Sequence, residues 1–273
     1  MTYIANLLAI IFISAFGTLL AQDVTGVVID ANSKQPIQFV NIGIAGKNKG
    51  TVSDVNGKFH LVIDSSFDSD SILFTMIGYN PRVIAVSELK SKANNKVEMH
   101  ERNHEIEEVT IKPKNYKEKT LGVTSRSSII EAGFKHNNLG YEYGVLMKVK
   151  KTAYIKQVQV NIANCTYDTV FFRLNIYEAQ GKNKFINILN EPIYINLLKK
   201  DVKNEILIDL RSLNIVVEGV FLVTLEHVKD LGIGKLSFST GFSNKTYYRM
   251  TSQGEWATSW IGIAISVLAD VER

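Results

Sequence analysis

A short segment in the middle of the chain could bind a metal ion. His100, Glu101 and His104 have the spacing His-Glu-x-x-His, in which two histidines bind zinc and the glutamate acts as general base on the zinc-bound water. This chemistry needs a helix, because a helix brings residues i and i+4 to one face. The flanking residues 97–99 and 109–111 are β-type instead. The segment is therefore predicted to be a solvated loop without catalytic residues or metal ligands. A zinc-dependent hydrolase remains a remote alternative.

Aromatic residues near the C-terminus are the second candidate site. Exposed aromatic rings beside an arginine can stack on sugar rings or hold an extended peptide. Alternate aromatic residues of a β-sandwich usually belong to its core, which is the competing interpretation. The predicted ligand-binding residues are Tyr247, Tyr248, Arg249, Trp256 and Trp260.

Three weaker patterns are better explained by structure than by chemistry. Cys165 has no base among its neighbours and is interpreted as a small buried residue. The sequence Asp-Val-Asn-Gly at 54–57 lacks the later ligands of a calcium loop and predicts a hairpin turn. Gly232 and Gly234 lack the third glycine and the helix of a dinucleotide site. No cofactor is expected.

The first half of the chain consists of short β-type runs separated by turn residues. Phe59, Leu61 and Ile63 alternate with Lys58 and His60, the period of a half-buried strand. These runs predict about seven strands, enough for a small two-sheet sandwich. The eight β-type runs lie at residues 24–29, 37–45, 51–53, 58–63, 71–77, 82–86, 96–99 and 107–111.

The passages GVVIDANSKQPIQFVNIGIAGKNKGTVSDVNGKFHL and ILFTMIGYNPRVIAV carry a resemblance within residues 23–111. Their ordered set of residues resembles the carboxypeptidase-like regulatory domain family. The set is Gly26, Asp30, Pro36, Gly50, Thr51, Asp54, Gly57, Phe59, Gly78 and Tyr79. The resemblance implies a seven-stranded, transthyretin-like β-sandwich that accompanies other domains without doing chemistry itself. It does not imply peptidase activity.

The second half returns to β-type runs after residue 140. Nine runs, at 143–149, 154–162, 169–178, 192–197, 205–210, 220–226, 235–240, 246–250 and 260–268, predict a second sandwich of jelly-roll type. The passages FFRLNIYEA and IDLRSLNIVVEGVFLVTLE resemble C-terminal domains of uncharacterised bacterial envelope proteins. The predicted fold class is thus all-β with two sandwich domains, at 22–111 and 141–273.

A basic linker is expected between the two domains, at residues 112–140. Residues 112–156 hold ten basic and three acidic side chains, and four lysines surround Pro113. Without apolar periodicity, such a segment is interpreted as a solvated tether.

An apolar, uncharged run at residues 7–21 predicts export. Its 15 residues are fewer than the roughly 20 that a membrane-spanning helix needs, so residues 1–21 are interpreted as a signal peptide. An uncleaved anchor is the alternative. The mature chain is expected to have no transmembrane span and to be periplasmic, outer-membrane-associated or extracellular. With one cysteine it has no internal disulfide.

The overall charge excludes one class of partner. A net charge of +4 on 273 residues gives little support for nucleic-acid binding, which depends on many cations. The predicted function is an exported, non-catalytic cell-envelope protein with a spacer or docking module and a C-terminal recognition domain. The expected partner is another envelope protein or a glycan. The alternative is a carbohydrate- or peptide-binding protein that uses the C-terminal aromatic residues.

Overall fold

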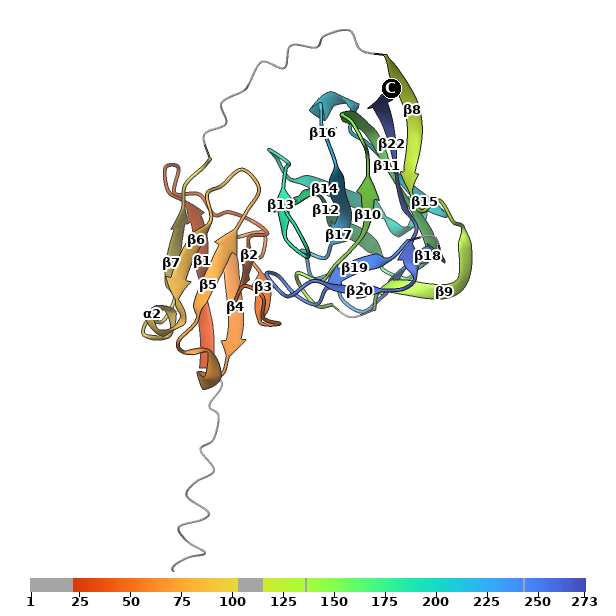
Figure 1. The fold of residues 1–273 in the computed structure, drawn as a ribbon. Helices are drawn as coiled ribbons and strands as arrows, with labels where there is room; N and C mark the ends of the chain where they lie inside the picture. The colour runs from red at the N-terminus through yellow and green to blue at the C-terminus, as the bar shows by residue number, and fades with distance from the viewer. Residues whose placement is uncertain (1–21, 103–114, 136, 243) are drawn as a thin grey trace, which may run out of the picture.

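Two β-sandwiches lie side by side in the computed structural model (Figure 1). The structure describes residues 22–102, 115–135, 137–242 and 244–273. The signal peptide predicted at 1–21 and the run predicted at 107–111 lie outside these ranges. No helix in the described ranges has the length and apolar composition needed to cross a membrane.

The N-terminal domain has two sheets, ordered β4-β1-β7 and β3-β2-β5-β6. Side chains from both sheets form one core, in which Phe59 and Phe74 pack edge to face at 5.6 Å. The predicted alternation in β4 is confirmed: Phe59, Leu61 and Ile63 are buried, and the residues between them are exposed. The elements are β1 (Gln22–Asp30), β2 (Asn41–Gly43), β3 (Gly50–Val52), β4 (Lys58–Ile63), η1 (Ser65–Phe67), β5 (Ser71–Thr75), β6 (Arg82–Ala85), α2 (Val86–Lys90) and β7 (Asn95–Met99).

The C-terminal domain also has two sheets. One is ordered β13-β12-β17-β10-β19-β20 with β14 beside β12; the other is ordered β21-β18-β11-β22-β8, with β15 and β16 beside β11 and β9 beside β18. A large apolar core lies between them. The elements are β8 (Tyr116–Gly122), β9 (Ser127–Phe134), β10 (Glu142–Lys148), β11 (Ala153–Cys165), β12 (Thr169–Ala179), β13 (Phe185–Asn187), β14 (Ile193–Leu198), η2 (Lys199–Asp201), β15 (Glu205–Asp209), η3 (Arg211–Leu213), β16 (Val216–Val217), β17 (Val220–Glu226), β18 (Leu236–Gly241), β19 (Thr246–Arg249), β20 (Ala257–Ser259), β21 (Gly262–Ile263) and β22 (Ile265–Glu272).

The all-β prediction is confirmed, but the linker predicted at 112–140 is wrong over much of its length. β8 pairs with β22 from Tyr116 to Gly122, and β9 pairs with β18. β8 is an edge strand with four consecutive exposed residues, Lys117 to Thr120. Edge strands carry charges, and lysine in particular, that discourage pairing with other chains. Because of these lysines, the sequence of β8 lacks the alternation of apolar and polar residues from which a strand is predicted.

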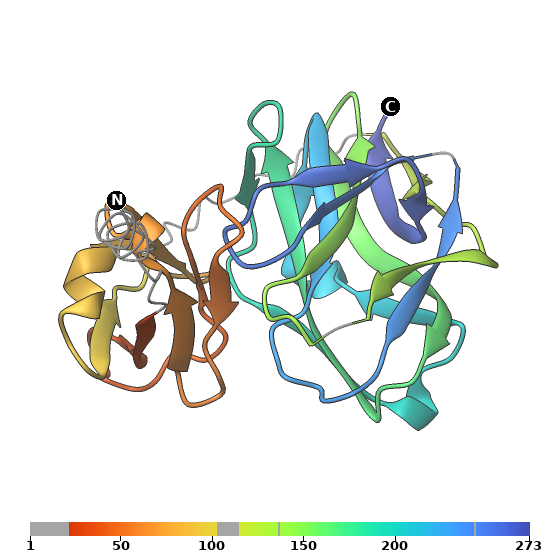
Figure 2. The ribbon, with the colours of Figure 1, turned by 90° about the horizontal axis from the view of Figure 1, so that it is seen from below.

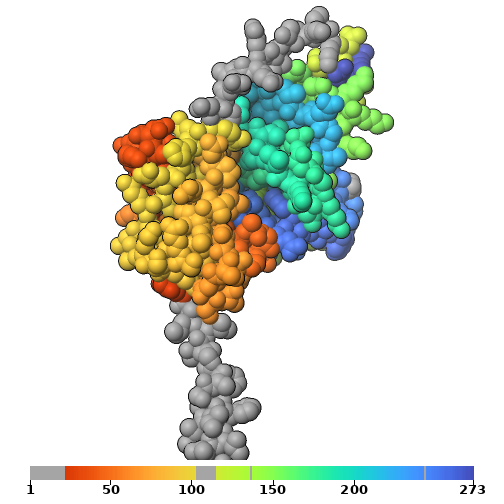
Figure 3. Space-filling view, turned by 60° about the vertical axis from the view of Figure 1, so that its left-hand side comes forward, coloured from red at the N-terminus to blue at the C-terminus, as the bar shows by residue number. Residues whose placement is uncertain are grey.

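The two domains contact each other directly, as Figures 2 and 3 show from two further directions. A small apolar cluster joins Phe39 and Val52 of the first domain to Val228 of the second, with Phe171 and Tyr194 packed against it. The Phe39 ring lies 5.1 Å from that of Phe171 and 5.4 Å from that of Tyr194. The interface is therefore partly a hydrophobic core shared by both sandwiches.

The turn at residues 251–254 of the C-terminal domain lies against β2 and β3. A Cβ atom added to Gly43 or Gly50 would lie only 2.4 Å or 2.2 Å from the Ser252 carbonyl oxygen. The Gln253 carbonyl accepts a 2.9 Å hydrogen bond from the Gly46 amide, and its side chain donates to Thr75 Oγ1 at 2.6 Å. Glycine at these positions lets the two backbones approach closely.

Candidate functional site: the cleft between the two sandwiches

The structure separates the five predicted C-terminal site residues into three groups. On β19, alternation places Tyr247 and Arg249 on one face and Tyr248 on the other. Tyr248 packs against Tyr143, at 6.0 Å between ring centroids. Trp260 lies elsewhere: it is 66% exposed and stacks on Phe242 at 5.7 Å. The five residues therefore do not form one patch.

Arg249 and Trp256 do come together. β20 pairs with β19 immediately after Trp256, and the Arg249 guanidinium lies 5.0 Å from the centre of the Trp256 ring. Phe185 of β13 packs edge to face on both Trp256 and Tyr247, at 5.4 Å and 5.8 Å. This aromatic wall supports the arginine from one side.

The His-Glu-x-x-His segment has extended backbone in its described part. Glu101 forms a β-bridge with Tyr79, the His100 carbonyl accepts from the Asn80 amide, and the Arg102 amide donates to the Gly78 carbonyl. The zinc motif requires a helix, and the backbone at 100–102 is not helical. His104 lies outside the described residues. No cluster of three or more potential metal-binding side chains occurs in the described ranges.

Two buried ion pairs lie side by side at the domain interface. Arg173 of β12 binds Glu226 of β17 at 2.8 Å, and Arg249 binds Glu142 of β10 at 2.6 Å. The strand pairings explain this arrangement, since Arg173 lies opposite Glu226 and Glu142 opposite Arg249. Cross-strand neighbours of opposite charge stabilise a sheet.

Asparagine and tyrosine side chains join the two ion pairs into one network. Asn175 Nδ2 donates to Glu142 at 2.9 Å and to Glu226 at 2.8 Å. Tyr177 donates its hydroxyl to Glu142 at 2.9 Å, and Thr224 also donates to Glu142. Nearly all the charged groups buried here are therefore paired and hydrogen-bonded. Burying a charge without such partners would cost much free energy.

The pKa values of the two glutamates shift in opposite directions. Burial raises the pKa of Glu142, against the opposing effect of Arg249. Burial would also raise the pKa of Glu226, but Arg173 and then Arg249 outweigh it and lower that pKa. Both carboxylates are completely buried behind their arginines, so they hold the guanidinium groups in place.

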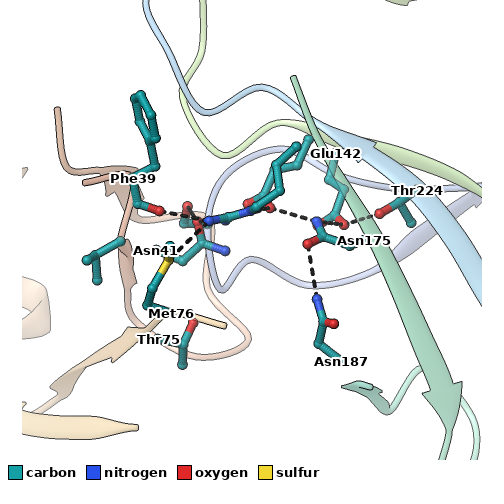
Figure 4. A network of polar contacts seen from close by, with 12 residues as sticks. Phe39, Asn41, Thr75, Met76, Glu142, Asn175, Asn187 and Thr224 are labelled. Atoms are coloured by element: carbon teal, nitrogen blue, oxygen red, sulfur yellow. Dashed lines mark hydrogen bonds and ion pairs between the residues drawn. The ribbon is translucent and has the colours of Figure 1, made fainter. Parts of the chain in front are cut away.

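Arg173 also binds the other domain. Its Nη1 donates to the Phe39 carbonyl at 2.8 Å, and its Nη2 donates to Asn41 Oδ1 at 2.6 Å. Phe39 has φ 56°, a left-handed conformation that is costly for a bulky residue and persists only where surrounding contacts enforce it. Figure 4 shows the residues that converge on this point from the two domains: Phe39, Asn41, Thr75 and Met76 from one, and Glu142, Asn175, Asn187 and Thr224 from the other.

A cleft of about 490 Å³ opens above the network, between the two domains. Among the described residues, its lining includes three arginines, Arg102, Arg173 and Arg249, but no aspartate or glutamate. The carboxamide side chains of its lining are Asn41, Asn80, Asn175, Asn187 and Gln253, and its aromatic ones are Tyr79, Tyr177 and Phe185. Its volume falls within the usual range of small-molecule sites, about 300–1,000 Å³.

Two side-chain donors of the cleft make no hydrogen bond in the described part of the chain. Arg249 uses Nε and Nη2 on Glu142 and Tyr177, which leaves Nη1. Asn41 accepts from Arg173 and Ser252 through Oδ1, which leaves Nδ2. Both residues line the cleft and are more than nine-tenths buried. Neither nitrogen belongs to the fully buried side-chain atoms without a partner, so both keep access to the cleft and are available to a bound molecule.

The sequence prediction included only Arg249 among the residues that line this cleft. Arg173 and Asn175 were missed because they lie within FFRLNIYEA, which has the pattern of a buried strand. A signal was present: arginine is rarely buried without a partner, so an arginine inside such a run indicates a buried ion pair.

Comparisons with known proteins agree with the description of the N-terminal domain. Residues 24–111 match a family model described as CarboxypepD_reg-like domain, which confirms the predicted resemblance. No curated protein matches the chain.

Two solved structures cover much of the chain at low similarity. The crystal structure of BcpA, the major pilin subunit of Bacillus cereus, is 12% identical, covers 90% of this chain and 69% of its own, and has a TM-score of 0.19. The infectious bursal disease virus VP2 subviral particle is 8% identical, covers 93% of this chain and 65% of its own, and has the same TM-score of 0.19. Neither similarity bears on function.

Proposed function

We propose, from the premise that residues 24–111 are a CarboxypepD_reg-like domain, that this chain is a non-catalytic binding protein of the cell envelope. In this proposal the regulatory-like domain is docked on the C-terminal sandwich, and the cleft between them is the recognition surface. The observation that carries it is Arg173, which is buried, binds both domains and lines the cleft.

Several features support a binding role. The described lining of the cleft consists mainly of guanidinium, carboxamide, aromatic and apolar groups and contains no histidine, cysteine, lysine, aspartate or glutamate, the residues that most often act as acid, base or nucleophile. The carboxylates that pair with Arg173 and Arg249, Glu226 and Glu142, are wholly buried. Export is supported by the apolar run at 7–21.

One observation favours a second candidate surface. Phe242 and Trp260 are 75% and 66% exposed and stack on each other. Such a pair could bind a sugar ring or peptide away from the cleft.

A binding screen tests the proposal. Purified protein spanning residues 22–273 would be applied to glycan and peptide arrays in three forms: wild type, the cleft variant Phe185→Ala/Asn187→Ala, and the surface variant Phe242→Ala/Trp260→Ala. Binding that is lost only in the cleft variant supports the proposal. Binding lost only in the surface variant moves recognition to the second site. Peptidase or glycosidase turnover that requires zinc and His100 would overturn the non-catalytic assignment.

A further inference from the structure

Ligand recognition in the cleft depends on which charged groups of the two ion pairs line it, the arginines or the glutamates. Arg173 and Arg249 line the cleft, whereas Glu142 and Glu226 have no exposed surface and lie behind them. Each ion pair therefore presents its positive end to the cleft. A third arginine, Arg102, lines the same cleft. A negatively charged group is favoured at such a surface, because a fixed guanidinium binds a carboxylate through strong charge-assisted hydrogen bonds.

Two donors of the cleft that make no hydrogen bond within the described residues indicate the position of that group. Arg249 Nη1 and Asn41 Nδ2 have no hydrogen bond within the described ranges, and they come from different domains, on β19 and β2. Both are donors only, so both call for an acceptor. A carboxylate offers about four lone-pair sites on two oxygens, enough to accept from both donors at once.

The remaining lining favours a sugar over a peptide. Carboxamides both donate and accept hydrogen bonds, as do the hydroxyl groups of a sugar. The rings of Tyr79, Tyr177 and Phe185 give the cleft apolar surfaces on which the C–H face of a pyranose can pack. An extended peptide is more often bound through main-chain hydrogen bonds to a sheet edge. The polar groups named in this cleft belong to side chains instead.

We propose that the cleft binds an acidic saccharide, with the sugar carboxylate between Arg249 and Asn41 and the ring hydroxyls on the surrounding carboxamides. This inference rests on the proposed function, since it names the ligand class of the same cleft.

Calorimetric titration of the full mature chain tests the charge requirement. The probes are digalacturonate, diglucuronate and dimannuronate, each compared with its own methyl ester, which keeps the ring and removes the charge. At least one acid should bind, and its ester should bind about 10-fold more weakly or worse, because a charge-assisted contact of about 1.4 kcal/mol or more is lost. Equal binding of acid and ester, or no binding of any acid at millimolar concentration, overturns the inference.

A conservative variant tests the position. Asn41→Asp keeps the oxygen that accepts from Arg173 and Ser252 but replaces the unpartnered donor by negative charge, so binding of the acid should fall about 10-fold or more. Asn56→Asp, in the exposed turn at 54–57, makes the same change in net charge away from the cleft and should bind like wild type. Unchanged affinity in Asn41→Asp overturns the inference.

The outcomes separate this inference from the proposed function. If neutral glycans or free-carboxylate peptides bind and the Phe185→Ala/Asn187→Ala variant loses them, the cleft is a recognition site but the acidic-saccharide assignment is wrong. If no array ligand depends on the cleft, the proposed function fails as well.

Discussion

Arg173 is the residue on which both the C-terminal core and the domain interface depend. It is 2% exposed, binds Glu226 within its own domain and reaches Phe39 and Asn41 in the other. Removing one partner of a buried ion pair leaves the other charge buried without compensation, which costs about 3–5 kcal/mol.

We therefore expect Arg173→Leu to lower the free energy of unfolding by about 3–5 kcal/mol, measured by urea denaturation. Arg211→Leu is the matched control, because its ion pair with Asp209 is more than half exposed and should contribute no more than about 1 kcal/mol. Equal, small effects of the two substitutions would contradict the structural role given to Arg173.

His227 is a second buried residue with a measurable consequence. Its ring is fully buried, at 5.4 Å from Phe172 and 5.8 Å from Phe134. Burial lowers its pKa to about 4. The unfolded chain therefore takes up a proton near pH 6.5, while the folded chain takes it up only near pH 4.

Stability should consequently fall as the pH drops from about 6.5 to about 4, by roughly 3 kcal/mol from this residue. In His227→Phe, which keeps an aromatic ring in the same cluster, that part of the pH dependence should disappear. Unfolding free energies of both proteins between pH 4 and pH 8 measure the difference. The exposed His100→Gln variant is the control; a wild-type profile parallel to that of His227→Phe would refute the prediction.

Among the elements, the edge strand β8 shows why a strand can be missed in a sequence. Its side chains are mostly exposed, and within the described residues its backbone pairs with β22 on one edge only. The lysines thus protect an open edge instead of forming a tether.

We expect Lys117→Val/Lys119→Val to fold but to self-associate as its concentration rises, because an apolar edge pairs with other chains. Light scattering over a concentration series measures this. Lys199→Val/Lys200→Val makes the same change on the exposed turn η2, which is not part of a sheet, and should remain dispersed. Identical behaviour of the two variants would argue against edge protection.

At the scale of the whole molecule, the docking of the two sandwiches depends on a close approach between their backbones. A Cβ atom at Gly50 would lie 2.2 Å from the Ser252 carbonyl oxygen, which belongs to the other domain. Since the Ser252 oxygen is a backbone atom, relieving the clash requires the turn at 251–254, or the domain that carries it, to move away from β3.

Gly50→Ala should therefore weaken the docking while each sandwich stays folded. We expect one calorimetric transition in the wild type and two in the variant, together with a larger radius of gyration in solution scattering. Gly46→Ala is the control: its Cβ would meet no atom within 4 Å, although its positive φ adds a local strain of about 1 kcal/mol. A single transition at unchanged dimensions in Gly50→Ala would contradict this account.

The sequence by itself determined the elements that local pattern encodes. Alternation of Phe59, Leu61 and Ile63 fixed the buried face of β4, and turn residues delimited most strands of both sandwiches, because side-chain period and turn chemistry are properties of neighbouring residues. The regulatory-like domain followed from residues close together in the chain.

Only the tertiary structure decided what lies between the domains. Arg173 and Asn41 are 132 residues apart in the chain, and Glu142 reaches Arg249 across 107 residues. No periodicity connects such residues; strand register and domain docking bring them together. The predicted aromatic site was divided for the same reason, since adjacent residues of β19 point to opposite faces. The chain sequence specifies two sandwiches, and the packing of one on the other creates the cleft.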